Sequence, residues 1–169
     1  MIKDIDVFFE QAKPLVEAFV KFMTDNDADR IAQADHFCYK CATTEEFEHL
    51  RSLFEFESRF VFQSIISERR IAYIELSRPL ETPFGPLKYL ELSDQRKDGS
   101  QKGGFDHIEL YPTKVSYDEL VETFEKRGVK ATKVVRPHHT TYDISLEGGF
   151  LIRLEKEALI DKIKAVEMG

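Results

Sequence analysis

Apolar residues recur along the chain with two periods that alternate. Residues 4–24 carry apolar side chains at three- and four-residue spacing, which predicts an amphipathic helix that Pro14 kinks or divides. Residues 35–41 alternate instead, which predicts a strand, and a Thr-Thr-Glu-Glu capping box then opens a helix over residues 44–56. Further strands are expected at residues 60–66, 70–77 and 87–93.

The second half of the chain repeats this order. A strand is expected at residues 105–111, followed by a Ser-Tyr-Asp-Glu capping box and a helix that ends at Arg127 before Gly128. Three more strands are expected at residues 130–136, 141–146 and 150–155. The chain is therefore predicted to be an α+β protein whose tandem βαβββ modules form a cupped, incomplete barrel.

The predicted organisation has one part outside the repeat. An N-terminal helical extension covers residues 1–34, and residues 35–169 form one domain. That domain contains a first module at residues 35–94, a second at residues 105–156 and a closing helix at residues 157–166.

The first strand of each module opens with the dipeptide Asp-His. Because strand side chains alternate, His36 shares a face with Cys38, and His107 shares a face with Glu109. The opposite faces are apolar and suited to helix packing. These polar faces are too organised for random surface, and the duplication favours a site between the modules over two ordinary core histidines.

Carboxylates on the last strand of each module complete the predicted site. Glu91 lies in the first module and Glu155 near the end of the second. If both sheets curl with their polar faces inward, the two glutamates meet His36 and His107. Two imidazoles and two carboxylates suit a divalent metal ion such as Zn, Ni, Co, Mn or Fe(II). The simpler interpretation of each glutamate is a solvated strand residue.

Composition narrows the function classes. A net charge of −7 without any basic block argues against nucleic-acid binding. No signal-like segment or long apolar run is present, so a cytoplasmic protein without membrane association is expected. Cys38 and Cys41 fall on opposite strand faces and are expected to be separate reduced thiols.

Short motifs in this order resemble a known family. The strings Ala34-Asp35-His36, Tyr89-Leu90-Glu91-Leu92-Ser93 and Gly104-Phe105-Asp106-His107-Ile108-Glu109 are similar to those of the YecM-like family, within the vicinal oxygen chelate superfamily of glyoxalases, bleomycin-resistance proteins and extradiol dioxygenases. The resemblance implies that His36, Glu91 and His107 are metal ligands. Arg153 occupies the usual fourth position, and Glu155 matches a histidine of the YecM-like pattern.

The resemblance also implies an activity. Two neighbouring oxygens of a small oxygen-rich metabolite would bind the metal, with isomerase or lyase chemistry favoured over a dioxygenase reaction. The residues expected to carry protons are Glu75, Tyr89 and Glu109. Those expected to bind substrate are Arg78, Arg136, His138, His139 and Arg153.

Two alternatives remain open at this point: a metal-free small-molecule binding protein on the same fold, and a fold relic that mediates protein contacts. Because one chain holds both modules, a monomer or a homodimer is expected.

Overall fold

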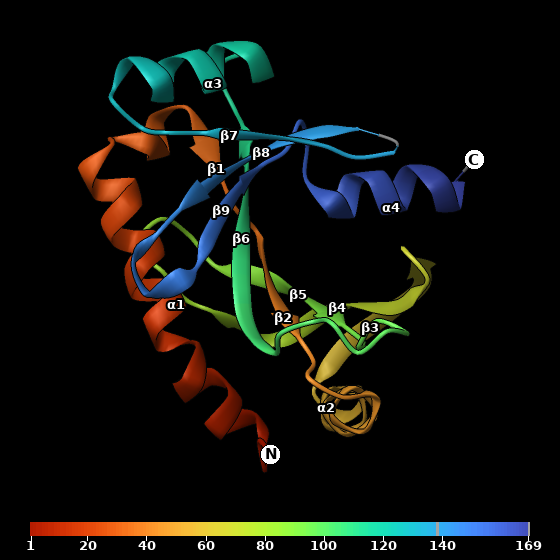
Figure 1. Ribbon diagram of the computed structural model, residues 1–169. Helices are drawn as coiled ribbons and strands as arrows, with labels where there is room; N and C mark the ends of the chain where they lie inside the picture. The colour runs from red at the N-terminus through yellow and green to blue at the C-terminus, as the bar shows by residue number, and fades with distance from the viewer. Residues whose placement is uncertain (138, 169) are drawn as a thin grey trace.

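A single open sheet runs through the computed structural model, which describes residues 1–137 and 139–168 (Figure 1). The helices are α1 (Ile5–Asp25), α2 (Thr44–Phe56), α3 (Tyr117–Lys126) and α4 (Leu159–Met168), with short 3-10 turns η1 (Ala28–Arg30) and η2 (Glu147–Gly149). The strands of the first half are β1 (Ala32–Gln33), β2 (His36–Lys40), β3 (Ser58–Ile66), β4 (Arg69–Leu80) and β5 (Leu87–Ser93). Those of the second half are β6 (Gly104–Pro112), β7 (Thr132–Val135), β8 (Thr140–Ser145) and β9 (Leu151–Leu154).

The sheet consists of two equivalent halves. Its strand order is β3-β4-β5-β2-β6-β9-β8-β7, with β1 added to β6. In each half the opening strand pairs in parallel with the last strand, β2 with β5 and β6 with β9. The halves meet where β2 pairs antiparallel with β6. The predicted fold class of paired βαβββ modules in an open, cupped sheet is confirmed.

Local sequence explains where the helices begin. The Thr43 hydroxyl accepts a hydrogen bond from the Glu46 backbone N–H at the start of α2. Ser116 and Glu119 form a reciprocal capping box at the start of α3. The predicted bounds of α2 and β5 match the structure. In α1 the helix continues through Pro14 as one element, so the chain is not divided into two helices there.

The helix α1 is an integral part of the core. Its Phe8 is fully buried and meets the rings of Phe54 and Phe105 at centroid distances of 5.1 and 4.9 Å. Phe37 and Tyr39, on the apolar face of β2, complete this aromatic group. The segment before the repeat therefore covers the junction of the two modules. No described helix is long and apolar enough to cross a membrane.

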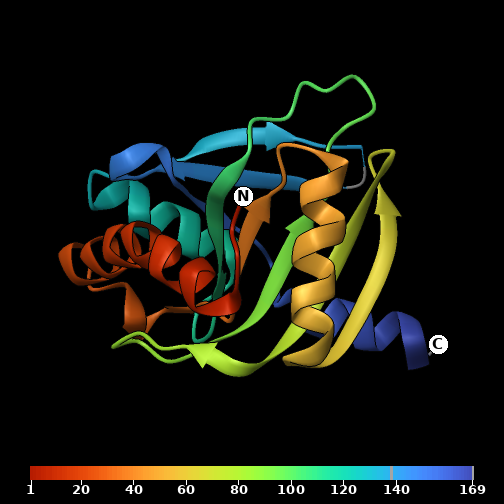
Figure 2. The same cartoon turned by 90° about the horizontal axis from the view of Figure 1, so that it is seen from below.

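The last helix packs on the other side of the sheet. In Figure 2, α4 lies behind β3 and β4, whereas α2 lies in front of them. Ala158, Ile160 and Ile163 pack against Tyr73 and Tyr89 in a small second core. One end of the cup's inner face is thus covered by the C-terminal segment.

Replacing Phe8 with alanine should lower the free energy of unfolding by about 3–5 kcal/mol, because it leaves a cavity among buried rings. Urea denaturation would measure the change. Phe56→Ala is the matched control, since that side chain is 89% exposed and its loss should cost less than about 0.5 kcal/mol. Equal effects of the two substitutions would contradict the position of α1 in the core.

Candidate metal centre

Four acidic and imidazole side chains converge at the junction of the modules. They are His36 from β2, Glu91 from β5, and His107 and Glu109 from β6. Each offers one ligand atom, and these four atoms all lie within 4.8 Å of one another. Both histidines are only 1% exposed, and Glu109 is 8% exposed. We refer to these four residues as the acidic cluster.

Strand register produces this convergence. Cys38 pairs with Glu91 across the parallel ladder and with His107 across the antiparallel one. Side chains opposite one another in neighbouring strands lie on the same face, so β5, β2 and β6 present one row of polar groups. The ladder between β2 and β6 shifts register after Cys38.

Glu109 is the centre of the cluster. Its Oε2 lies 2.7 Å from His36 Nε2 and 3.6 Å from His107 Nε2. The Oε2 atom of Glu91 lies 3.5 Å from His36 Nε2. The same Glu109 oxygen therefore faces the Nε2 atom of both imidazoles.

The Asp-His dipeptides explain how the rings are oriented. His107 Nδ1 lies 2.7 Å from Asp106 Oδ2, and His36 Nδ1 lies 3.6 Å from Asp35 Oδ1. In both modules the aspartate therefore faces Nδ1 and leaves Nε2 turned toward the other cluster residues. A carboxylate in that position is the usual orienting partner of a metal-binding histidine.

The electrostatics favour charged forms of all four groups. Burial opposes the charge on His36, but the carboxylates of Glu109, Asp35 and Glu91 outweigh it and raise the His36 pKa well above its usual value. Burial likewise opposes the charge on Glu109, yet the two imidazoles hold its pKa well below its usual range. The pKa of Glu91 is lowered in the same way, mainly by His36.

Cys38 belongs to a second, overlapping group with Asp106 and His107. Burial raises the pKa of the Cys38 thiol well above its usual value. Cys41 is also a buried free thiol.

Arg153 occupies the position that corresponds to Glu91. It pairs with Glu109 in the β6–β9 ladder, as Glu91 pairs with Cys38 in the β5–β2 ladder. Its guanidinium is bound by Asp143, with 3.0 Å from Nε to Oδ1, and its Nη1 lies 3.4 Å from His107 Nε2. In the second module, the carboxylate of Glu109 therefore lies on β6 and the guanidinium of Arg153 lies on β9.

Glu155, a predicted ligand, lies outside the cluster. It follows the end of β9, where its backbone N–H donates to Leu110 O. Its carboxylate contacts His139 Nε2 at 3.2 Å and Lys162 Nζ at 3.4 Å. Glu109, predicted as a proton carrier, instead lies among the candidate ligands. Its shared strand face with His107 was the signal in the sequence.

The other predicted residues are dispersed. Tyr89 stacks on Tyr73 at 5.3 Å beneath α4, and Glu75 is its partner in the next strand. Arg136 donates to Thr141 Oγ1 beside β8. His138 lies outside the described residues.

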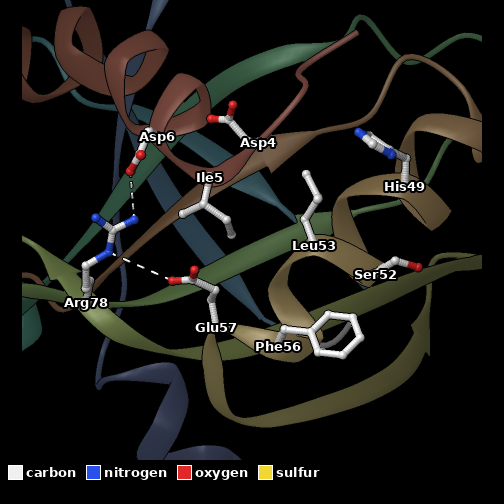
Figure 3. A pocket seen from close by; sticks show the side chains of 9 residues that line it. All are labelled: Asp4, Ile5, Asp6, His49, Ser52, Leu53, Phe56, Glu57 and Arg78. Carbon is white, nitrogen blue, oxygen red and sulfur yellow. Dashed lines mark hydrogen bonds and ion pairs between the residues drawn. The ribbon is translucent and has the colours of Figure 1, made fainter.

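Arg78, which was predicted to bind substrate, lies at a different place from the acidic cluster. It contacts Asp6 and Glu57 at a cleft of about 400 Å³ between the start of α1 and the end of α2 (Figure 3).

Tyr73 adds a polar group next to the cluster. Its ring meets the His36 ring edge to face at 5.4 Å, and the side chain is 1% exposed. Its hydroxyl is buried without a hydrogen-bond partner among the described residues. Burial and the neighbouring carboxylates raise the Tyr73 pKa above its usual value, so the hydroxyl keeps its proton.

Solved structures of other proteins are similar to this chain. A solved structure described as "Structural Genomics, Protein EC4020" is 18% identical, with a TM-score of 0.67 over 94% of this chain and 91% of that one. A hypothetical protein from Bacillus halodurans is 14% identical, with a TM-score of 0.46 over 75% and 96% of the two chains. A methylmalonyl-CoA epimerase is 13% identical, with a TM-score of 0.47 over 73% and 93%.

The paired βαβββ modules share the fold of the first of these structures over nearly the whole length of both chains. A search of curated protein sequences finds no match. The family model described as "YecM protein" matches residues 1–166. Because that match spans nearly the whole chain, the protein belongs to the YecM family.

Proposed function

We propose that the acidic cluster holds a divalent metal ion and that the protein is a metal-dependent enzyme acting on a small oxygen-rich metabolite. The observation that carries the proposal is the meeting of four ligand atoms within 4.8 Å, with an aspartate facing Nδ1 of each histidine. The amended ligand set is His36, Glu91, His107 and Glu109.

The residues fit such an ion. Glu109 is buried and Glu91 is half-buried, and two such carboxylates close together are costly unless positive charge compensates them, which a divalent cation supplies. Imidazole and carboxylate donors suit Zn, Ni, Co, Mn or Fe(II). The aspartates at positions 35 and 106 would keep both Nε2 atoms available, as orienting carboxylates do in other histidine-metal sites.

The chemistry that a bound cation supplies is polarisation of substrate oxygens. The chain's own groups would do the rest. The Tyr73 hydroxyl retains its proton and has no described hydrogen-bond partner, so it can donate to a substrate oxygen. Asp143 holds Arg153 beside His107, where the guanidinium can stabilise negative charge that develops on the substrate.

The number of donors favours isomerase or lyase chemistry over a dioxygenase reaction. Fe(II) oxygenases use two histidines and one carboxylate, which leaves positions for both substrate and O₂. A second carboxylate in the cluster removes one of those positions. Proton transfer within a chelated substrate needs metal positions for the substrate oxygens but none for O₂.

Arg153 supports a second candidate function, metal-free binding of a small molecule. Its Nη1 lies 3.4 Å from His107 Nε2, and its positive charge can compensate the cluster carboxylates without any ion. In that case the same cup would sequester a ligand without chemistry.

Metal content of untagged protein tests the main proposal. After dialysis against each candidate ion, elemental analysis should find about one ion per chain, because the cluster forms one site. Glu109→Ala and His107→Ala should lose it, whereas Glu155→Ala should retain it. Loss of the ion in Glu155→Ala, with retention in Glu109→Ala, would contradict the amended ligand set.

Asp106→Asn should weaken metal binding about 10- to 100-fold, because the amide no longer orients the His107 ring as a carboxylate does. Competition with a chelator would measure the affinity. Asp98→Asn, on the exposed loop after β5, is the control and should leave the affinity unchanged. An unchanged affinity in Asp106→Asn would remove the role given to the Asp-His dipeptide.

Arg153→Gln separates the two candidate functions. If the cluster binds metal, removing a neighbouring cation should leave the affinity unchanged or raise it up to about tenfold. If Arg153 itself is the compensating cation, this variant should be less stable than the wild type and still take up no metal. Thermal unfolding and metal titration would measure both effects, with Arg136→Gln as the control outside the cluster.

A further inference from the structure

Arg69, at the start of β4, is a half-buried cation that forms no ion pair within the described part of the chain. Its Nε and Nη1 atoms are inaccessible to solvent and make no hydrogen bond to any described residue. The adjacent Arg70 differs, since it binds both Glu48 and Asp94. Buried donors left unpaired are destabilising, so the two unpaired nitrogens of Arg69 indicate a missing acceptor.

Strand alternation directs Arg69 to the inner face of the cup. It lies on the same face of β4 as Ile71 and Tyr73, and Tyr73 is paired with Glu91 of the cluster. Burial and repulsion from Arg96 lower the Arg69 pKa, while Cys38, Glu91 and Asp106 oppose that change. Of the acidic cluster, Glu91 thus interacts electrostatically with the guanidinium, although the two form no ion pair.

The loop after β5 places further positive charge nearby. The Gln95 side chain donates to Ala42 O and Gln101 O and accepts from the Arg96 backbone N–H. This arrangement holds Arg96 at a cleft of about 330 Å³ that Arg69 and Lys97 also line. Glu68 and Asp94 line the cleft too, but Asp94 is already bound to Arg70.

We infer that Arg69, assisted by Arg96, binds an oxyanion of the substrate, so that the metabolite carries a carboxylate or a phosphate-type group in addition to its metal-binding oxygens. A guanidinium presents several donors in one plane, which suits both groups. The inference rests on the proposed function, because the other end of the substrate is placed at the acidic cluster.

The strand geometry limits the size of this substrate. Arg69 and Tyr73 are four positions apart, which corresponds to about 13 Å along β4. An arginine side chain is long enough to cover part of such a distance. The remaining gap fits a compact metabolite of a few carbons rather than a large conjugate.

Binding of three matched probes to metal-loaded protein tests the inference. Glycerol 3-phosphate and 3,4-dihydroxybutanoate each combine two neighbouring hydroxyls with an anion, and glycerol lacks the anion. We expect both anionic probes to bind more tightly than glycerol in calorimetric titrations. The tighter of the two identifies the oxyanion as phosphate or carboxylate.

Variants assign the effect to the guanidinium. Arg69→Gln should weaken the anionic probes at least about tenfold, as expected for a lost hydrogen bond to a charged group, while metal content stays unchanged. The affinity of Arg69→Lys for the anionic probes should lie between those of the wild type and Arg69→Gln, because lysine keeps the charge but lacks the planar set of donors of a guanidinium. Arg30→Gln, which removes the same charge from an exposed site, should match the wild type.

Equal affinities in wild type and Arg69→Gln, or equally tight binding of glycerol, would overturn the inference. If Arg69→Gln does not fold, Arg96→Gln decides the same question through a smaller loss, about threefold by the same reasoning. If the wild type takes up no metal, the proposed function fails and inorganic phosphate is titrated into the metal-free protein. Saturable binding that Arg69→Gln loses would then support the anion site, and its absence would refute it.

Discussion

The antiparallel pairing of β2 with β6 is the constraint on which the rest of the structure depends. It brings the opening strands of the two modules together, so that His36 and His107 face the same interior. Every other cluster residue is positioned relative to this pair, through the parallel ladder to β5 or from β6 itself. On the opposite face the same two strands carry Phe37 and Phe105, which pack with Phe8 of α1. One ladder therefore fixes both the aromatic core and the site.

The two modules have diverged in where they carry their carboxylates. In the first, Glu91 stands on the last strand opposite Cys38. In the second, Glu109 stands on the opening strand opposite Arg153. A cation at the position equivalent to Glu91 is tolerated because Asp143 binds it. The two modules thus match in the positions of the histidines and their aspartates, but the carboxylate and the opposing strand residue have exchanged strands.

This reversal explains how far the sequence could predict the site. Alternation along single strands was sufficient to place His36 and Glu91 on inner faces that meet, and it put Glu109 on the face of His107. Choosing between Glu109 and Glu155 required knowing where β9 ends and how it aligns with β6. Glu155 lies just beyond the strand, where His139 and Lys162 bind it. The sequence also could not predict that Arg69 lacks an acceptor, because any acceptor would have to come from strands that are distant in sequence.

The position of α4 also makes the two ends of β5 unequal as routes by which a substrate could reach the acidic cluster. Its apolar residues cover Tyr89 near the beginning of β5, whereas the positively charged loop follows the end of that strand. Glu91 lies between the two. A polar metabolite entering past Tyr89 would have to displace a packed apolar helix, which costs about 25 cal/mol for each Å² of apolar surface exposed. The charged end of β5 imposes no such cost, and an anion approaching there is attracted before it reaches the carboxylates.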